Sequence, residues 1–276
     1  MKGTYESDGA RLGFRDSGAG LAIVFLHPTP LDREFWRPMV EDLRGVRAIV
    51  PDFRGHGESQ LGELPVGGFL RVPDAPVLSM RRLAADLLAL LDHLEVPQAV
   101  FVGCSVGGYV LLELWRMAPE RMTALAFVCS KPQADAEANL LKRVESIAQL
   151  KANGTQAFFD GAAQSLIGKS ARKRRPEIVA ELRARMTLPA EAVIAMQTGL
   201  AVRPDSLPTV RTIGVPVLAI AGGEDTSTLP AEMEAYNAAP GGCEFHLLPD
   251  AGHFAAYEQP EKVAALIAEW LKQVEA

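Results

Sequence analysis

Short apolar runs alternate along the chain with longer amphipathic segments. Residues 22–26 form a continuous apolar run, as expected of a strand that is covered on both faces. Residues 11–16 alternate and predict an earlier, antiparallel strand. The remaining strands that the pattern predicts span residues 47–50, 99–102, 124–128, 215–221 and 244–248.

The segments between these runs have helical periodicity. Residues 80–94 place leucines on one broad stripe, residues 109–117 are apolar almost all round, and residues 258–274 close the chain with an amphipathic pattern. Strands that alternate with helices of this length are typical of parallel strands joined by crossover helices. We therefore expect an α/β core.

Residues 131–206 break the alternation, because they contain no convincing strand. Their periodicity predicts helices at about 134–150, 155–166, 176–187 and 189–202. We interpret residues 131–206 as a helical cap, or lid, inserted into a core made of residues 1–130 and 207–276. The connection 60–79 is also long, and long connections in compact domains tend to be functional or mobile.

Composition narrows the class of protein. The 276 residues are 48% hydrophobic and 22% charged, which suits one core with an insertion and argues against disorder. A net charge of −6 argues against nucleic-acid binding. Three cysteines make no disulfide framework, and no Cys/His cluster predicts a metal site. With no signal-peptide or membrane-span pattern, we expect a soluble cytoplasmic protein without membrane partners.

The candidate nucleophile lies in residues 103–107, which read G-C-S-V-G and match the G-x-S-x-G pattern. The pattern directly follows a predicted strand and precedes a predicted helix. A sharp turn at this place pushes the side chain of Ser105 out above the sheet edge, and the flanking glycines let neighbouring backbone pack closely. The context predicts a nucleophilic serine at position 105.

A serine hydroxyl needs a base to remove its proton. His253 lies in a short loop between the last strand and the last helix, and it is the predicted base. Core packing or surface exposure explains His246, a solvated or capping role explains His93, and a turn role explains His56. His27 belongs to the loop after the strand 22–26.

The acid that orients the base should follow a parallel strand. Asp225 comes immediately after the strand predicted at 215–221, and it is the preferred candidate. Glu224 and Asp250 are the alternatives. The resulting chain order of serine, aspartate and histidine is the one used by α/β sheets of this type.

Two backbone N–H groups should stabilise the oxyanion. One is the N–H of Val106, which follows the nucleophile. The other should come from the loop after the strand 22–26. Because Pro28 and Pro30 have no N–H, Thr29 is the predicted second donor.

Taken together, these residues resemble the α/β-hydrolase fold over nearly the whole chain. The resemblance rests on residues 103–108, on D-F-R-G-H-G-E-S at 52–59, on G-E-D at 223–225, and on A-G-H-F at 251–254 with E-Q-P-E at 258–261. It is strongest to small carboxylesterases, enol-lactonases and cofactor-free haloperoxidase/perhydrolases. The resemblance implies an eight-stranded, mostly parallel sheet flanked by helices, with a helical cap after the sixth strand. His27-Pro28 departs from the usual His-Gly of the oxyanion loop.

The resemblance and the serine together predict hydrolysis of a small-molecule carboxylic ester, thioester or lactone, with no cofactor or metal. Same-fold alternatives are carbon–carbon bond hydrolysis, hydroxynitrile cleavage and perhydrolysis, and a non-catalytic ligand receptor is a further one. His27, Phe158 and Phe254 are candidates for the substrate pocket. The basic run 169–175 is either a solvated segment or a dock for an acidic partner. Whether the protein is a monomer or a homodimer stays open.

Overall fold

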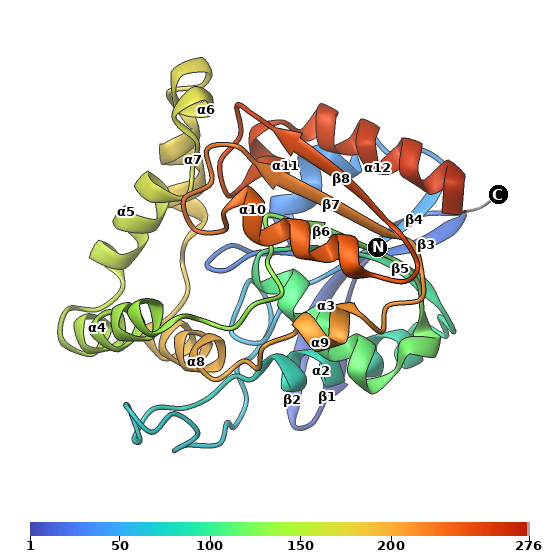
Figure 1. Cartoon of the computed structure of the whole chain (residues 1–276). Coiled ribbons are helices and arrows are strands. Elements are labelled where there is room, and N and C mark those ends of the chain that lie inside the picture. The colour runs from blue at the N-terminus through green and yellow to red at the C-terminus, as the bar shows by residue number, and fades with distance from the viewer. Residues whose placement is uncertain (275–276) are drawn as a thin grey trace.

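A computed structural model of the chain describes residues 1–274. Over these residues, eight strands form one sheet in the order β1-β2-β4-β3-β5-β6-β7-β8 (Figure 1). Their bounds are Lys2–Ser7 (β1), Ala10–Gly18 (β2), Leu21–Leu26 (β3), Val46–Pro51 (β4), Ala99–Cys104 (β5), Met122–Val128 (β6), Val217–Gly222 (β7) and Cys243–Leu248 (β8). The predicted α/β-hydrolase fold is confirmed.

Strand direction determines where a site can form. β1 pairs with β2, and β2 with β4, in the antiparallel sense, while all pairs from β4 to β8 are parallel. The carboxyl ends of β3, β5, β6, β7 and β8 therefore meet at one edge of the sheet, where open α/β sheets bind their ligands. β1 was not predicted, because in Lys2–Ser7 only Tyr5 and Ser7 are buried and the apolar signal is weak.

Helices cover both faces of the sheet. α2 (Met80–His93) and α3 (Val106–Met117) contribute to the core on one face, with Val24, Ile49 and Phe101 of the strands. α1 (Arg37–Val40) and α12 (Pro260–Val274) contribute to the core on the other face. Short helices also occur at Arg33–Trp36, Pro119–Arg121, Leu207–Val210 (α9), Pro230–Met233 (α10), Glu234–Ala238 and Ala255–Glu258 (α11).

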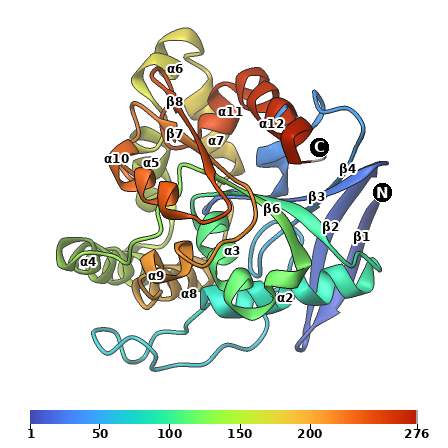
Figure 2. The ribbon, with the colours of Figure 1, turned by 45° about the vertical axis from the view of Figure 1, so that its right-hand side comes forward.

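A block of helices lies between β6 and β7, as expected. It consists of α4 (Glu137–Asn153), α5 (Gln156–Ser165), α6 (Lys169–Arg174), α7 (Ile178–Arg185) and α8 (Ala190–Ala201). We call these five helices and their connections the helical block; it stands to one side of the sheet in both views (Figures 1 and 2). The unpredicted helix α6 falls inside the basic run, where six residues give too short a pattern to show periodicity.

The long connection 60–79 joins β4 to α2 and packs against the helical block. Phe69 and Val72 are buried in the same core cluster as Ile147 and Leu150 of α4. The Leu78 N–H donates to the C=O of Ala195 in α8 at 2.9 Å. The connection thus fastens the block to the core. Of the helices within residues 1–274, none combines the length and the apolar character that a membrane crossing needs.

Candidate active site

Ser105 occupies the sharp turn between β5 and α3. Its backbone has φ of 53° and ψ of −116°, a left-handed conformation that L-residues seldom adopt. Two hydrogen bonds hold this turn: the Ser105 N–H donates to the C=O of Val128 at 3.0 Å, and the Ser130 hydroxyl donates to the C=O of Ser105 at 2.7 Å. The turn presents the Ser105 side chain at the carboxyl edge of the sheet.

The glycines of the pattern are required by close backbone contacts. A Cβ at Gly103 would lie 2.6 Å from the carbonyl carbon of Gly107, and a Cβ at Gly107 would lie 2.4 Å from the backbone oxygen of Leu26. Both approaches are shorter than real Cβ contacts allow. The turn is therefore accessible only to a sequence with glycine on both sides of the serine.

Three side chains from separate loops meet at this turn. His253 Nε2 lies 2.8 Å from Ser105 Oγ, and His253 Nδ1 lies 2.7 Å from Asp225 Oδ2. Asp225 Oδ1 accepts from the N–H groups of Ser227 at 2.8 Å and Thr228 at 3.0 Å, which fixes the carboxylate. With Nδ1–H donating to the carboxylate, Nε2 is left to accept the serine proton. The structure thus brings together the three side chains that the sequence singled out.

The competing acids point elsewhere. Glu224 accepts from the Ser170 N–H at 2.8 Å and from the Ser170 hydroxyl at 2.6 Å, both in the helical block. Although burial opposes it, these bonds lower the pKa of Glu224. Asp250 contributes its backbone oxygen, which accepts from Arg174 at 3.0 Å. Neither carboxylate is bonded to His253.

Glu258 supports the loop of the base, a role that sequence reasoning missed. Its buried carboxylate accepts from the N–H groups of Gly252 at 2.8 Å and Phe254 at 3.2 Å, on either side of His253, and from the Gly168 N–H of the helical block at 3.1 Å. Burial raises the pKa of Glu258, and the three N–H donors oppose that shift. The available signal was the E-Q-P-E motif, which gives no hint of its N–H partners.

The two predicted oxyanion donors have free N–H groups. Within residues 1–274, neither the Thr29 N–H nor the Val106 N–H has a hydrogen-bond acceptor. The Thr29 hydroxyl lies 3.1 Å from His56 Nε2, and His56 Nδ1 lies 2.9 Å from the C=O of Arg54. His56 thereby anchors the Thr29 side chain and leaves the N–H of the same residue available.

His27 fixes the start of the same loop. Its Nδ1 lies 3.0 Å from the C=O of Pro28, and its Nε2 accepts from the Phe53 N–H at 3.0 Å. Burial lowers the pKa of His27 to about 4 and that of His56 to about 3, so both rings are neutral near pH 7. Both ring nitrogens of His27 are occupied by backbone.

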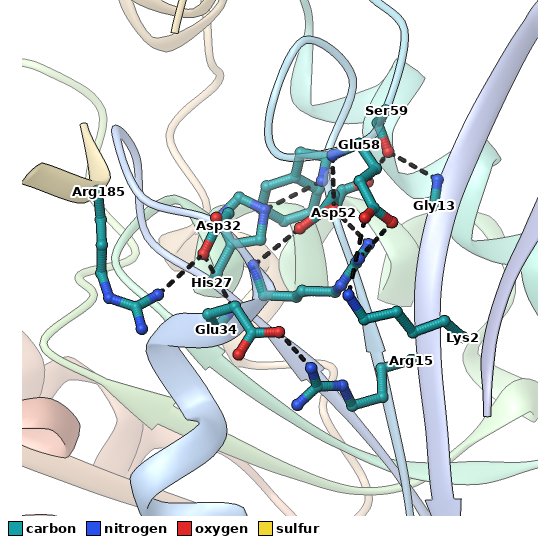
Figure 3. A network of polar contacts seen from close by, with 12 residues as sticks. Lys2, Gly13, Arg15, His27, Asp32, Glu34, Asp52, Glu58, Ser59 and Arg185 are labelled. Atoms are coloured by element: carbon teal, nitrogen blue, oxygen red, sulfur yellow. Dashed lines mark hydrogen bonds and ion pairs between the residues drawn. The ribbon is translucent and has the colours of Figure 1, made fainter. Parts of the chain in front are cut away.

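A buried carboxylate below the loop completes its support (Figure 3). Asp52 accepts from the Arg33 N–H at 2.8 Å, from the Arg33 guanidinium at 2.6 Å and from the Glu58 N–H at 3.0 Å. Burial raises the pKa of Asp52 to about 6, while these N–H groups and the guanidinium oppose the shift. From the helical block, Arg185 approaches Asp32 of the loop at 3.8 Å. The loop that carries Thr29 is thus held from both sides.

Of the three pocket candidates, only Phe158 lines a cavity. This cavity has a volume of about 410 Å³ and lies between the helical block and the core. His27 and Phe254 are fully buried, so neither side chain reaches it. The Phe254 ring packs edge-on against Phe35 at 5.8 Å between centroids. In this structure both residues support the loops of the site from within the core.

Neither a reactive thiol nor a group of metal ligands accompanies the site in the described part of the chain. The thiol of Cys104, next to Ser105, is fully buried, and burial raises its pKa well above the ordinary value. It therefore does not supply a thiolate. Within the described part of the chain, no three His, Cys, Asp or Glu side chains gather as metal ligands.

The fold and this site define a protein of the α/β-hydrolase class, and comparisons with known proteins agree. The chain belongs to the alpha/beta hydrolase family, whose model matches residues 23–266. It is 31% identical to a thermophilic esterase from Thermogutta terrifontis, with a TM-score of 0.89 and full coverage of both chains.

Two further relatives show the breadth of the family. The chain is 27% identical to the putative non-heme bromoperoxidase BpoC of Mycobacterium tuberculosis, covering 96% of this chain and 99% of that one. It is 25% identical to 3-oxoadipate enol-lactonase 1 of Acinetobacter baylyi, covering 92% of this chain and 90% of that one. Esterase and lactonase relatives support an enzyme that hydrolyses an ester or a lactone.

Proposed function

We propose that the protein hydrolyses carboxylic esters, thioesters or lactones of small molecules through an acyl-enzyme on Ser105. The hydrogen-bonded series from Asp225 through His253 to Ser105, with distances of 2.7 Å and 2.8 Å, carries this proposal. It supplies a base for a hydroxyl that is otherwise a poor nucleophile, and it holds that base in the required tautomer.

The reaction follows from the roles of these groups. Ser105 Oγ attacks the carbonyl carbon while His253 Nε2 takes the hydroxyl proton, and the negative charge on the carbonyl oxygen is stabilised by the N–H groups of Thr29 and Val106. His253 then protonates the departing alcohol or thiol as its bond to the acyl carbon breaks. A water molecule, deprotonated by His253, attacks the acyl-enzyme and releases the acid and free Ser105.

We also propose that residues 131–206 act as a cap over a core of residues 1–130 and 207–276. The helical block contacts the site at three points. Leu166 accepts from the His253 N–H at 2.8 Å, Gly168 donates to Glu258, and Ser170 binds Glu224. A block in these contacts is placed to shape the substrate chamber and to exclude water from it.

Substitution of the nucleophile tests the proposal. Ser105→Ala should lower kcat/KM for short-chain 4-nitrophenyl esters by about 10⁴-fold or more, because loss of a triad member removes the nucleophilic route. Circular dichroism should show an unchanged fold. Ser17→Ala, on β2 and away from the site, is the matched control and should keep full activity. Equal activity of both variants contradicts the proposal.

The similarity to BpoC favours a second candidate reaction on the same acyl-enzyme. Attack by hydrogen peroxide in place of water would release a peroxy acid and free Ser105, with no change of oxidation state at the acyl carbon. Adding hydrogen peroxide to the ester assay and trapping the peroxy acid with a thioether tests this candidate. A peroxy acid yield that is absent from Ser105→Ala supports it, and acid as the sole product contradicts it.

A further inference from the structure

The cavity between the helical block and the core is lined by residues that neighbour Ser105, Asp225 and His253 along the chain or bind them. Tyr109 lines it and lies one helical turn after Ser105 on α3. Thr226 lines it and follows Asp225 in sequence. Leu166 lines it and accepts from the N–H of His253. A substrate whose carbonyl reaches Ser105 has this cavity of about 410 Å³ as a neighbouring chamber.

The walls of the cavity are mainly polar. Asn139, Ser146, Ser165, Gln197, Thr226 and Ser227 contribute uncharged polar side chains. Phe158 and Leu166 are the apolar members of the lining among the described residues. Apolar surface gains little free energy when it is transferred from water to polar walls, so a long alkyl chain is a poor occupant.

The charged members of the lining are mostly cationic. Within residues 1–274, the lining contains three cationic side chains and one carboxylate. The cations are Lys131, Lys142 and Arg143, and the carboxylate is Asp135. Asp135 is already bound by two guanidiniums, that of Arg143 and that of Arg203, the latter at 2.8 Å. Although burial opposes ionisation, these two hydrogen bonds lower the pKa of Asp135 below its ordinary value. Although burial opposes the shift, Asp205 also acts on the Arg203 guanidinium and raises its pKa, so the two guanidiniums are balanced by two carboxylates.

Lys142 supplies the positive charge of the lining that no carboxylate of the described chain compensates. Among residues 1–274 no carboxylate lies within ion-pairing distance of its ammonium group, whereas Lys131 is paired with Glu232. Lys142 lies between this cavity and a neighbouring groove and lines both, whereas Glu145, almost one turn further along α4, lines only the groove. The positive excess is local, since the whole chain carries a net charge of −6. A cationic cavity in an anionic protein attracts anions to one place.

We propose that this cavity is a subsite for a carboxylate group, so that the preferred substrates are esters or lactones that carry a negative charge on the part remote from the scissile bond. Lys142 supplies the counter-charge. This inference rests on the proposed hydrolase function. Lys142 is the specificity-determining residue, because its charge is not neutralised by a partner.

A matched pair of substrates tests the inference. Mono-(4-nitrophenyl) adipate and 4-nitrophenyl hexanoate have acyl chains of the same length and differ in the terminal carboxylate. The wild-type protein should show a kcat/KM about tenfold higher for the adipate ester, after subtraction of spontaneous hydrolysis. Because salt screens such attraction, about 1 M NaCl should narrow the preference.

Charge removal assigns the effect to one side chain. Lys142→Gln should lower kcat/KM for the adipate ester about tenfold and leave that for the hexanoate ester within twofold. Lys151→Gln is the matched control, since Lys151 lies on the same helix, pairs with Asp74 at 2.7 Å and is not part of the lining. Equal losses for both esters, or no loss for either, overturn the inference.

The outcomes separate this inference from the proposed function. Hydrolysis of the hexanoate ester without a preference for the adipate ester refutes the subsite and leaves the hydrolase intact. Failure to hydrolyse either ester refutes both. The melting temperature measures binding without turnover. Free adipate should raise the melting temperature of the wild type and of Ser105→Ala, and it should leave the melting temperature of Lys142→Gln unchanged. The absence of any shift in the wild type contradicts the subsite.

Discussion

At Ser105 the backbone conformation places the side chain that we propose as the nucleophile. Its φ of 53° stores strain that costs about 1–3 kcal/mol in other settings, and close packing of the neighbouring glycines holds the turn in place. The turn aims the hydroxyl at His253 and leaves the Val106 N–H, at the start of α3, without an internal partner. The proposed nucleophile and the proposed oxyanion donor therefore depend on one local geometry.

This view predicts opposite effects for the same substitution at two glycines. Gly107→Ala places a Cβ against the backbone oxygen of Leu26, so it should lower the free energy of unfolding by about 1–3 kcal/mol and reduce ester turnover. Gly161→Ala, inside α5 and facing open space, should raise the free energy of unfolding by about 0.5–1 kcal/mol. Urea unfolding measures both. Equal stability of the two variants would refute the steric argument.

The sequence identified residues whose role depends on local context. Ser105 lies in a pattern whose strand and helix neighbours are visible in the chain, and His253 and Asp225 follow strands that could be predicted. Glu258 was not found, because its partners are backbone N–H groups that only the folded chain brings together. The burial of His27 was equally invisible, since a polar residue after a strand gives no sign that both ring nitrogens bind backbone.

Two short loops from distant parts of the chain meet next to His253. The loop before α6 and the loop after β8 approach so closely that a Cβ at Gly252 would lie 2.3 Å from the Gly168 nitrogen. Glu258 accepts N–H groups from both loops. The carboxylate therefore positions His253 and couples it to the helical block.

Removing this charge should affect turnover more than substrate binding. Hydrogen bonds to a charged acceptor contribute about 1.5–3 kcal/mol, so Glu258→Gln should lower kcat about 10–100-fold with a smaller change in KM, and it should displace the pH profile of kcat. Glu261→Gln, on the same segment and with an exposed side chain, is the control. Identical pH profiles for the two variants would assign Glu258 a purely structural role.

Elements with strong periodicity were predicted well, and short or exposed ones were not. The leucine stripe identified α2 to within one residue of its end, and α4, α5, α7 and α8 of the helical block were located to within a few residues. α3 begins at Val106, three residues before the predicted start, because glycines that the helix tolerates hide its first turn. Short helices such as α6 and α11 are formed by tertiary contacts and leave no pattern in the sequence.

For the whole molecule, buried titratable groups link stability to pH. His27 and His56 have pKa values of about 4 and about 3 in the fold, against 6.5 in water. A histidine with a lowered pKa binds fewer protons folded than unfolded, so its stabilising effect is lost as the pH falls below 6.5. The pKa of Asp52 is raised to about 6 from 3.8. Between these two pH values Asp52 therefore increases the free energy of unfolding as the pH falls, which opposes the histidines. Glu258, whose pKa is also raised, acts in the same direction as Asp52, and the two histidines outweigh these two carboxyls.

The free energy of unfolding should therefore fall by about 2 kcal/mol between pH 7 and pH 5. Urea unfolding across this range measures the change. In His56→Gln one of the two histidine contributions is missing, so the advantage of the wild type over this variant should shrink as the pH falls. A free energy of unfolding that is constant or increases on acidification contradicts the assignment of neutral, buried imidazoles.

A covalent probe tests directly whether Ser105 Oγ is the nucleophile. After treatment with a fluorophosphonate, intact-mass and peptide analysis should show a single adduct per chain, on Ser105, and should show none in Ser105→Ala or His253→Ala under the same conditions. An adduct on another residue of active protein, or full ester turnover by protein that takes up no label, would contradict the account.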